Sequence, residues 1–195
     1  QNISLLNQTR SRLDEVNLLL DFSRQLSGMD PDAILKSLLD SSRRVLQHAH
    51  AGVALVWDPQ TEMLIPRAAS GYADNTSMML IKYHPGEALP GTVFVNKTAR
   101  RVDEINFVRD YNLSTENLAI YRQATGGRLP VSSLLVPINT AEQSLGLLVL
   151  DNFNQTGAFL VEDEVLLLSL TQQIALSLDN VRLVQDTQER AAQLH

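Results

Sequence analysis

The residues that could carry chemistry are few and lie far apart in the sequence. Cysteine is absent, which excludes disulfides, thiolate metal ligands and thiol nucleophiles. There is no carboxylate cluster, no Ser-His-Asp set and no phosphate-binding glycine loop. The sequence therefore predicts no catalytic residues.

The four histidines, His48, His50, His84 and His195, are the remaining candidates for a metal or haem. His48 and His50 follow the end of a predicted helix, where a cation near exposed carbonyls is an ordinary cap. Two residues apart, they would not share a helical face. His84 precedes Pro85 in a loop. We therefore predict no metal site and do not expect haem.

Composition narrows the class of protein further. The chain has 195 residues, 44% of them hydrophobic, which is enough for one domain plus additional helix. A net charge of -6 and a pI near 5.1 argue against nucleic-acid partners, which bind through Lys and Arg. No apolar run approaches the roughly 20 residues that cross a bilayer, and no signal peptide is visible. We expect a soluble, cytoplasmic chain without membrane contact and, since it begins with Gln1, a piece of a longer protein.

Two long helices are predicted at the ends of the chain. The first covers residues 3–27 and ends at Gly28, and the second runs from Glu162 to about Leu194, with acids at its start that favour the helix dipole. Each carries an apolar stripe that predicts coiled-coil pairing with a second copy; the alternative is that both stripes cover the chain's own sheet. The stripes comprise Leu6, Leu13, Val16 and Leu20, with Leu5, Leu19 and Leu26 beside them, and then Leu167, Leu170, Ile174, Val181 and Val184, interrupted by Ser177.

The middle of the chain alternates between strands and short helices. Asp30 and Pro31 predict the start of a helix. Apolar runs over residues 133–151 lie on both sides of a polar turn, so both faces of their sheet should be covered, by helices on one side and a lid or pocket on the other. The remaining expectations are strands at 51–58, 62–71 and 100–104, helical turns at 73–80 and 91–96, and an irregular segment at 106–131. This order predicts an α+β fold or mixed sandwich with an antiparallel central sheet.

Three stretches together resemble the GAF domain, a module for small-molecule sensing and dimerisation. They are "SSLLVPINTAEQSLGLLVLDNF" with the helix after it, "SRQLSGMDPDAILKSLLDSSRRVLQHAHAGVALVWD" and "PGEALPGTVFVNKTARRVDE". The resemblance covers about residues 22–185. It implies a GAF-like, PAS-related α+β fold with five or six antiparallel strands, the terminal helices packed on one face and connector and loop segments on the other. Residues 1–27 would be a signalling and dimerisation helix, 28–185 the GAF domain and 186–195 the lead to a downstream module.

The sequence departs from the family pattern at the last helix. Leu160 and Val161 stand where the family usually has a Ser or Thr N-cap, so the following acids, Glu162 to Glu164, are expected to cap instead.

The resemblance also bears on cofactors. Family members that reduce free methionine sulfoxide work through cysteine, and bilin-binding members attach the chromophore through a thiol, so both are excluded; a noncovalent bilin remains an alternative. Members that bind cyclic nucleotides carry a dispersed pattern that Asn96, Lys97, Phe107 and Asp110 match only in part. We therefore expect no cofactor.

A small-molecule site is implied between the sheet and the segments near 83–111 and 121–135. Phe107, Tyr111 and Tyr121 would stack on a planar ligand. Arg109, Arg122 or Asp103 would supply polar contacts, and His84 would lie at the edge. The alternative is that the aromatic residues fill the space themselves.

These expectations lead to three competing functions. The first is a noncatalytic sensory domain of a signalling protein, such as a histidine kinase, a cyclic-dinucleotide enzyme or a transcription regulator, that binds a small molecule and transmits through dimeric terminal helices. The second is a ligandless module for dimerisation and transmission. The third is an enzyme, which turnover dependent on His84 or Asp103 would indicate.

Overall fold

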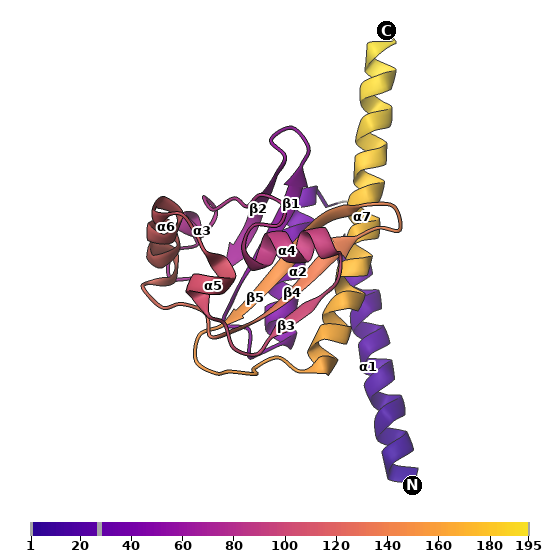
Figure 1. Cartoon of the computed structure of the whole chain (residues 1–195). Coiled ribbons are helices and arrows are strands. Elements are labelled where there is room, and N and C mark those ends of the chain that lie inside the picture. The colour runs from indigo at the N-terminus through magenta and orange to yellow at the C-terminus, as the bar shows by residue number, and fades with distance from the viewer. Residues whose placement is uncertain (1, 27–28, 195) are drawn as a thin grey trace.

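The structure is a computed structural model that describes residues 2–26 and 29–194. Its centre is a five-stranded antiparallel sheet in the order β2-β1-β5-β4-β3 (Figure 1). The strands are β1 (Ala51–Asp58), β2 (Met63–Ser70), β3 (Arg100–Val102), β4 (Ser132–Asn139) and β5 (Ser144–Asn152). The predicted α+β class with an antiparallel sheet is thus confirmed.

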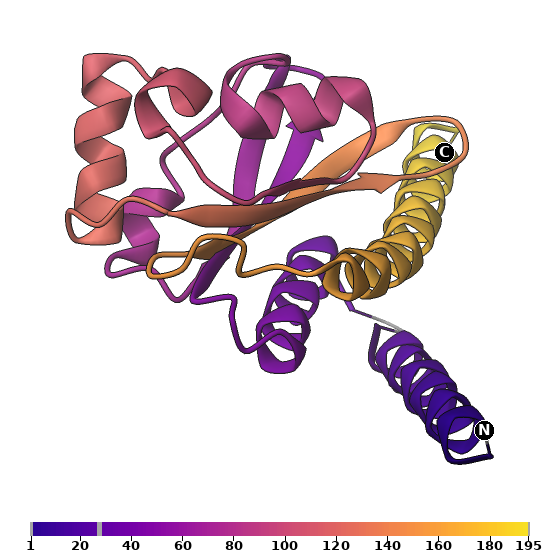
Figure 2. The same cartoon turned by 60° about the horizontal axis from the view of Figure 1, so that its bottom comes forward.

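Helices cover both faces of the sheet. Figure 2 shows α2 and α7 on one face, which we call the helix face, and α4 and α5 on the other, which we call the connector face. The small helices α3 and α6 pack against each other beside the connector face. The helices are α1 (Asn2–Leu26), α2 (Pro31–Val45), α3 (Asn75–Met78), α4 (Ala88–Asn96), α5 (Phe107–Tyr111), α6 (Thr115–Thr125) and α7 (Val161–Gln193).

Strands β4 and β5 bury side chains on both faces, as their apolar runs predicted. Leu148 and Leu150 point into the aliphatic core under α2 and α7, while Leu147 and Val149 point into the core of the connector face. The central position of β5 depends on Gly146. A Cβ at this residue would lie 2.0 Å from the carbonyl oxygen of Leu55 on β1, so no larger side chain fits without moving a strand.

The starts of α2 and α7 follow from their caps. Asp30 Oδ1 accepts a hydrogen bond from the Ala33 amide at 2.8 Å, and Pro31 occupies the first turn, as predicted. At α7 the amide of Leu160 donates to Asp163 Oδ2 at 2.7 Å. An acid of the first turn therefore binds the amide of the N-cap residue, while Leu160 offers the first-turn amides no side-chain acceptor in place of the missing Ser or Thr.

The sequence predicted an irregular segment at 106–131. The structure instead has two helices there, α5 and α6. Side-chain oxygens cap both starts: Asn106 accepts from the Arg109 amide and Ser114 from the Asn117 amide. Left-handed residues end both helices, Asn112 at φ 45° and Gly126 at φ 66°. The helices are 5 and 11 residues long, too short for a sustained apolar period, so their caps are the stronger signal.

Candidate functional site

The connector face holds a buried layer of aromatic rings. All four tyrosines of the chain lie in it, together with Phe107. Phe107 stacks on Tyr111 with ring centroids 4.5 Å apart and planes 13° apart. Tyr121 packs against both rings, at 4.8 Å from Phe107 and 5.6 Å from Tyr111. We call Tyr72, Tyr83, Phe107, Tyr111 and Tyr121 the aromatic layer.

A carboxylate is buried against this layer. Asp151 continues the alternation of β5 and points to the connector face, where it is 1% exposed. Its Oδ2 accepts a hydrogen bond from the Tyr72 hydroxyl at 2.6 Å, and its Oδ1 accepts one from Ser133 Oγ at 2.5 Å. Burial raises the pKa of Asp151 from 3.8 to about 6, against the opposing effect of the hydrogen bonds from Ser133 and Tyr72.

The hydroxyls of the layer lie within electrostatic range of this carboxylate. Burial, followed by the charge of Asp151, raises the pKa of both Tyr83 and Tyr111. The tyrosines therefore stay neutral and can donate hydrogen bonds, while Asp151, which is buried against the layer, has its pKa raised to about 6. Asp151 was not among the predicted site residues; its signal in the sequence is an acid at an inward-facing position of a buried strand, in "LGLLVLD".

The structure brings together only the aromatic half of the predicted ligand site. Phe107, Tyr111 and Tyr121 meet, but they are buried against one another, which agrees with the alternative that they fill the space themselves. The predicted polar residues lie elsewhere: Arg109, Arg122, Asp103 and His84 are all exposed.

Two of these polar residues have local partners that explain their positions. Arg109 Nε pairs with Asp110 Oδ1 at 2.9 Å, next to it in the sequence. The backbone amide of His84 donates to Glu87 Oε2 at 2.7 Å, within one loop. Both side chains are exposed rather than buried with the aromatic layer, and the polar contacts proposed for a ligand stay a prediction.

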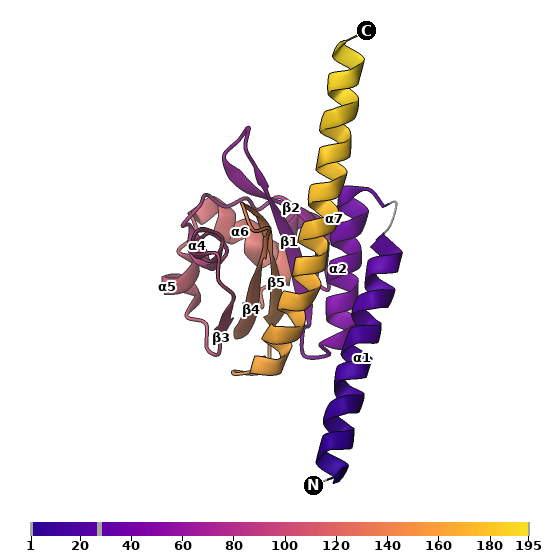
Figure 3. The ribbon, with the colours of Figure 1, turned by 90° about the vertical axis from the view of Figure 1, so that its right-hand side faces the viewer.

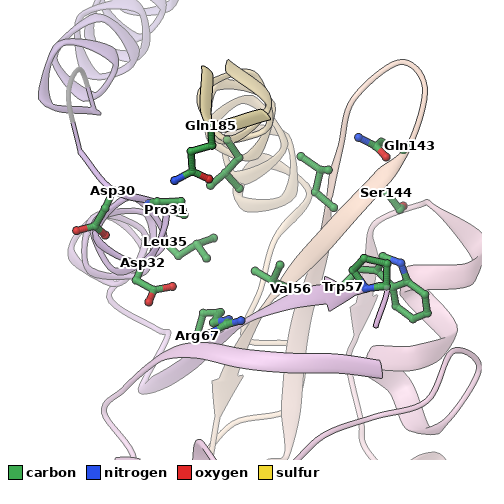
Figure 4. A pocket seen from close by; sticks show the side chains of 13 residues that line it. Asp30, Pro31, Asp32, Leu35, Val56, Trp57, Arg67, Gln143, Ser144 and Gln185 are labelled. Carbon is green, nitrogen blue, oxygen red and sulfur yellow. The ribbon is translucent and has the colours of Figure 1, made fainter. Parts of the chain in front are cut away.

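A groove with a volume of about 730 Å³ opens on the opposite side, at the helix face (Figure 4). It lies between the start of α2, the β1–β2 hairpin, the β4–β5 turn and α7. Leu35, Val56 and Leu178 are among its apolar walls, and Arg67 and Gln185 are among its polar side chains. Its volume falls in the range of small-molecule pockets, but none of the predicted ligand residues lines it.

Across residues 2–26 and 29–194, no group of three or more His, Asp or Glu side chains is arranged to hold a metal ion. None of the helices in these ranges is long and apolar enough to span a membrane.

The terminal helices differ in how much of their predicted stripes they expose. On α1 the whole stripe lies in solvent, with Leu6 68% and Leu13 57% exposed. Val16 and Leu20 are exposed as well. The positions Leu26 and Gly28 fall where the side chain or the backbone lies outside the described residues.

On α7 the predicted seam needs a correction. Ile174 is fully buried in the chain's own core, together with Leu167 and Leu170, and so is not available to a second copy. The reason is that the first half of α7 packs on β4 and α2. Val181 is half-buried against the same core, and only Val184 is exposed. The exposed leucines of α7, Leu176 and Leu183, lie outside the predicted seam.

Figure 3 shows the arrangement that results. Helix α1 runs beside the first half of α7, and the second half of α7 projects beyond the domain. The N- and C-termini lie at opposite ends of this rod of helices.

Comparison with known proteins identifies the family to which this fold belongs. A family model described as "GAF domain" matches residues 30–180. The GAF domain of a phosphoenolpyruvate-protein phosphotransferase from Coxiella burnetii has a similar structure, with a TM-score of 0.73 and 18% identity over 89% of this chain and 98% of that one. No curated protein matched the sequence at a significant level.

Two further solved structures come from proteins with different roles. The GAF domain of a putative sensor histidine kinase from Pseudomonas syringae pv. tomato matches with a TM-score of 0.66 and 22% identity over 95% of this chain and 99% of that one. Free methionine-R-sulfoxide reductase from Neisseria meningitidis, in complex with its substrate, matches with a TM-score of 0.66 and 16% identity over 87% and 91%. At these identities the likeness is one of fold, and the fold is shared by sensors and an enzyme.

Proposed function

The chain belongs to the GAF domain family, and we propose that it is a noncatalytic regulatory module of a signal-transduction protein that pairs with a second copy through its terminal helices. The observation that carries this proposal is the set of large apolar side chains that α1 and the second half of α7 leave in solvent. These are Ile3, Leu5, Leu6, Leu13, Val16 and Leu20 on α1, and Leu176, Leu183, Val184 and Leu194 on or beside α7.

Helix α1 packs on the domain through few side chains, so the domain alone stabilises it little. It spans 25 residues, yet its described side chains are exposed almost throughout, with Glu15, Leu18 and Leu19 the partly buried exceptions. Helices in proteins draw most of their stability from packing of an apolar face. A second copy would bury the outer stripe of α1 and supply that packing.

The sheet offers a physical connection between the connector face and the helices. Strand β5 contributes Leu148 and Leu150 to the core under α7. On its other side it contributes Val149 to the core of the connector face and Asp151, which accepts a hydrogen bond from Tyr72 of the aromatic layer. A rearrangement of the layer that shifts β5 would therefore change the packing of α7. Such a shift between two packings is how a domain of this kind would pass a signal along its helices.

The proposal is tested by measuring the mass of the chain in solution by sedimentation over a range of micromolar concentrations. We expect a dimer that Leu13→Glu converts to monomer, because the charge would lie in the buried seam. Val108→Glu is the matched control, since Val108 is 82% exposed in α5, away from the terminal helices. A wild-type chain that stays monomeric at high micromolar concentration would contradict the proposal.

A second candidate is small-molecule sensing in the aromatic layer, and the buried carboxylate of Asp151 is the observation that favours it. A ligand would have to displace part of the packing of Phe107, Tyr111 and Tyr121 and could then bond to Asp151 or Tyr72. The test is a metabolite screen by thermal shift, repeated with Asp151→Asn. A compound that raises the melting temperature of the wild type but not of the variant supports sensing. If no compound binds, the ligandless alternative holds.

A further inference from the structure

We propose that the groove on the helix face binds a small amphipathic anion, an apolar chain that carries one carboxylate, and that this ligand fixes the projecting second half of α7 to the domain. The groove lies on the other side of the sheet from the aromatic layer, and one chain supplies all the residues that line it. The inference therefore goes beyond the proposed function and does not depend on pairing with a second copy.

The interior of the groove is apolar. Leu35 of α2, Val56 of β1 and Leu178 of α7 line it from three different elements, and all three belong to the aliphatic core or pack against it. Leu145 of β5 and Pro31 of α2 extend this apolar surface on either side. An apolar chain of about ten carbons placed there would lose contact with water on several sides, and burial of this kind is the main source of affinity in small-molecule sites.

An irregularity in strand β2 places Arg67 at the groove. Two consecutive residues of β1 pair with Ala68 and Pro66, which leaves Arg67 between them as the extra residue of a β-bulge. Leu64 and Ala68 are four residues apart and would share a face in a regular strand, yet Leu64 lies in the core of the connector face and Ala68 in the aliphatic core. The bulge thus turns the strand over at Arg67, a device that is common beside functional sites.

Arg67 lies at the rim of the groove together with other hydrogen-bond donors. The side-chain amides of Gln143 and Gln185 line the groove as well (Figure 4). Arg67 is exposed and forms no ion pair within the part of the chain that the structure describes. A guanidinium holds its N–H donors in a fixed fork that matches the two oxygens of a carboxylate. The rim is therefore suited to an acidic head group above an apolar floor.

The acids near the groove have partners of their own. Asp30 accepts the hydrogen bond that caps α2, and Figure 4 shows its carboxylate directed away from the groove. Asp32 lies in the first turn of α2, where the helix dipole favours a negative charge. Asp58 is within electrostatic range of Arg67, but its oxygens accept hydrogen bonds within the β1–β2 turn. Arg67 is thus the charge at the rim that a ligand can best neutralise, and this favours an anion over a cation.

The groove joins the domain to the part of α7 that leaves it. Leu178 and Gln185 lie about two helical turns apart, so both face the groove from α7. The first half of α7 packs on β4 and α2, whereas the second half projects beyond the domain (Figure 3). A ligand in the groove would contact α7 at these two positions and the sheet and α2 on the other walls. Binding would therefore favour one angle between the projecting helix and the domain.

Calorimetric titration with decanoate tests the chemistry of the site, and decylammonium and decanol have the same chain with other head groups. At pH 7, below the concentrations at which these probes form micelles, we expect decanoate to bind one site per chain and at least about tenfold more tightly than decylammonium. Octanoate should bind about 15-fold more weakly than decanoate, since each buried methylene contributes about fourfold in affinity. The absence of saturable decanoate binding, or tighter binding of decylammonium, would overturn the proposal.

Substitutions decide whether the probe binds in the groove. Arg67→Gln should weaken decanoate binding at least about tenfold and leave decanol binding unchanged; because Arg67 is exposed, the fold should be retained. Arg122→Gln, at an exposed cation of α6, is the matched control and should not change decanoate binding. Leu178→Ala should weaken binding of both probes, with circular dichroism to confirm folding. Decanoate binding that Arg67→Gln does not weaken would place the probe elsewhere, as in the aromatic layer, and overturn the proposal.

Hydrogen exchange measures the effect of the ligand on α7. With decanoate bound, the backbone amides of residues 183–193 should exchange at least about threefold more slowly, and Arg67→Gln at the same decanoate concentration should show no such protection. Binding without protection of this segment would overturn the claim that the ligand fixes α7. A monomer in sedimentation would contradict the proposed pairing but leave this inference standing, so the two failures can be told apart.

Discussion

The two faces of the sheet are built from different kinds of side chain. Under α2 and α7 the core is aliphatic, with Phe159 as its one fully buried aromatic residue among the described side chains. On the connector face all four tyrosines are buried, and Trp57, Phe94, Phe107 and Phe153 pack with them. The connector face also buries the carboxylate of Asp151.

The aliphatic core of the helix face contributes mainly to stability, whereas the connector face carries the buried groups that can bond or titrate. Aliphatic side chains interlock closely and offer nothing to titrate or to bond, so the helix face is suited to hold α7 rigidly on the sheet. The connector face carries hydroxyls and an acid whose hydrogen bonds can be rearranged. If the molecule responds to a signal, the connector face is where the change would begin, and the helix face would pass it on.

The largest effect is expected from Ile174→Ala on the helix face. Ile174 is fully buried between α7 and the sheet, and truncation would leave a cavity that the aliphatic core closes only in part. We expect the free energy of unfolding to fall by about 4 kcal/mol, measured by urea denaturation.

The control for this prediction is Val108→Ala on the exposed side of α5, which should change stability by less than about 0.5 kcal/mol. A loss below about 1 kcal/mol for Ile174→Ala would mean that α7 is not fixed on the sheet. The core of the helix face would then not hold α7 more firmly than the connector face holds its own helices.

On the connector face the next largest effect is expected from Asp151→Asn. Because folding raises the pKa of Asp151 from 3.8 to about 6, the folded state binds the proton more tightly than the unfolded state. The contribution of Asp151 to the free energy of unfolding is therefore greatest below about pH 4. It is lost as the pH rises through about 6, and the total loss is about 3 kcal/mol. Asparagine cannot ionise, so the variant should gain about 2–3 kcal/mol at pH 7 and lose this pH dependence.

Asp74→Asn is the control of opposite sign. Hydrogen bonds from the Ser77 hydroxyl and amide lower the pKa of Asp74, so its contribution to stability is present above its ordinary pKa and lost as the pH falls. Asp74→Asn should thus weaken the protein at pH 7. Denaturation curves at pH values from about 3 to 7 compare the two variants, because the contribution of Asp74 is lost only below its ordinary pKa of 3.8. A decrease in stability at pH 7 for Asp151→Asn would show that the charged form of Asp151 is needed in the fold.

Much of the helix face could be predicted from the sequence. The spacing of apolar residues predicted β4, β5, α2 and α7, because burial of one or both faces of a strand or helix fixes which positions are apolar. Residue type, an Asp followed by Pro31, predicted Asp30 as the cap of α2. Spacing alone gave the wrong result for Ile174, because a stripe that packs on a sheet and a stripe that packs on a second helix have the same spacing.

The connector face was harder to predict for physical reasons. Its helices are short, so the caps at Asn106 and Ser114 carried more information than any period. The rings of Phe107, Tyr111 and Tyr121 come together only through tertiary packing, and their proximity could be inferred from the family resemblance but not from spacing. Asp151 was missed because an acid at the end of a strand is usually exposed, and only its strand register places it inside.

The smallest of the three effects is expected from Tyr111→Leu in the aromatic layer. Leucine keeps the site apolar but removes the ring that stacks on Phe107 and contacts Tyr121, and each aromatic contact contributes about 0.5–1.5 kcal/mol beyond burial. We expect a loss of about 2 kcal/mol by urea denaturation, and less than about 1 kcal/mol for Tyr111→Phe, which keeps the ring. If the two variants were equally destabilised, the hydroxyl rather than the ring would hold Tyr111 in place. The connector face would then be organised by polar bonds around Asp151, which is the arrangement a ligand could most readily replace.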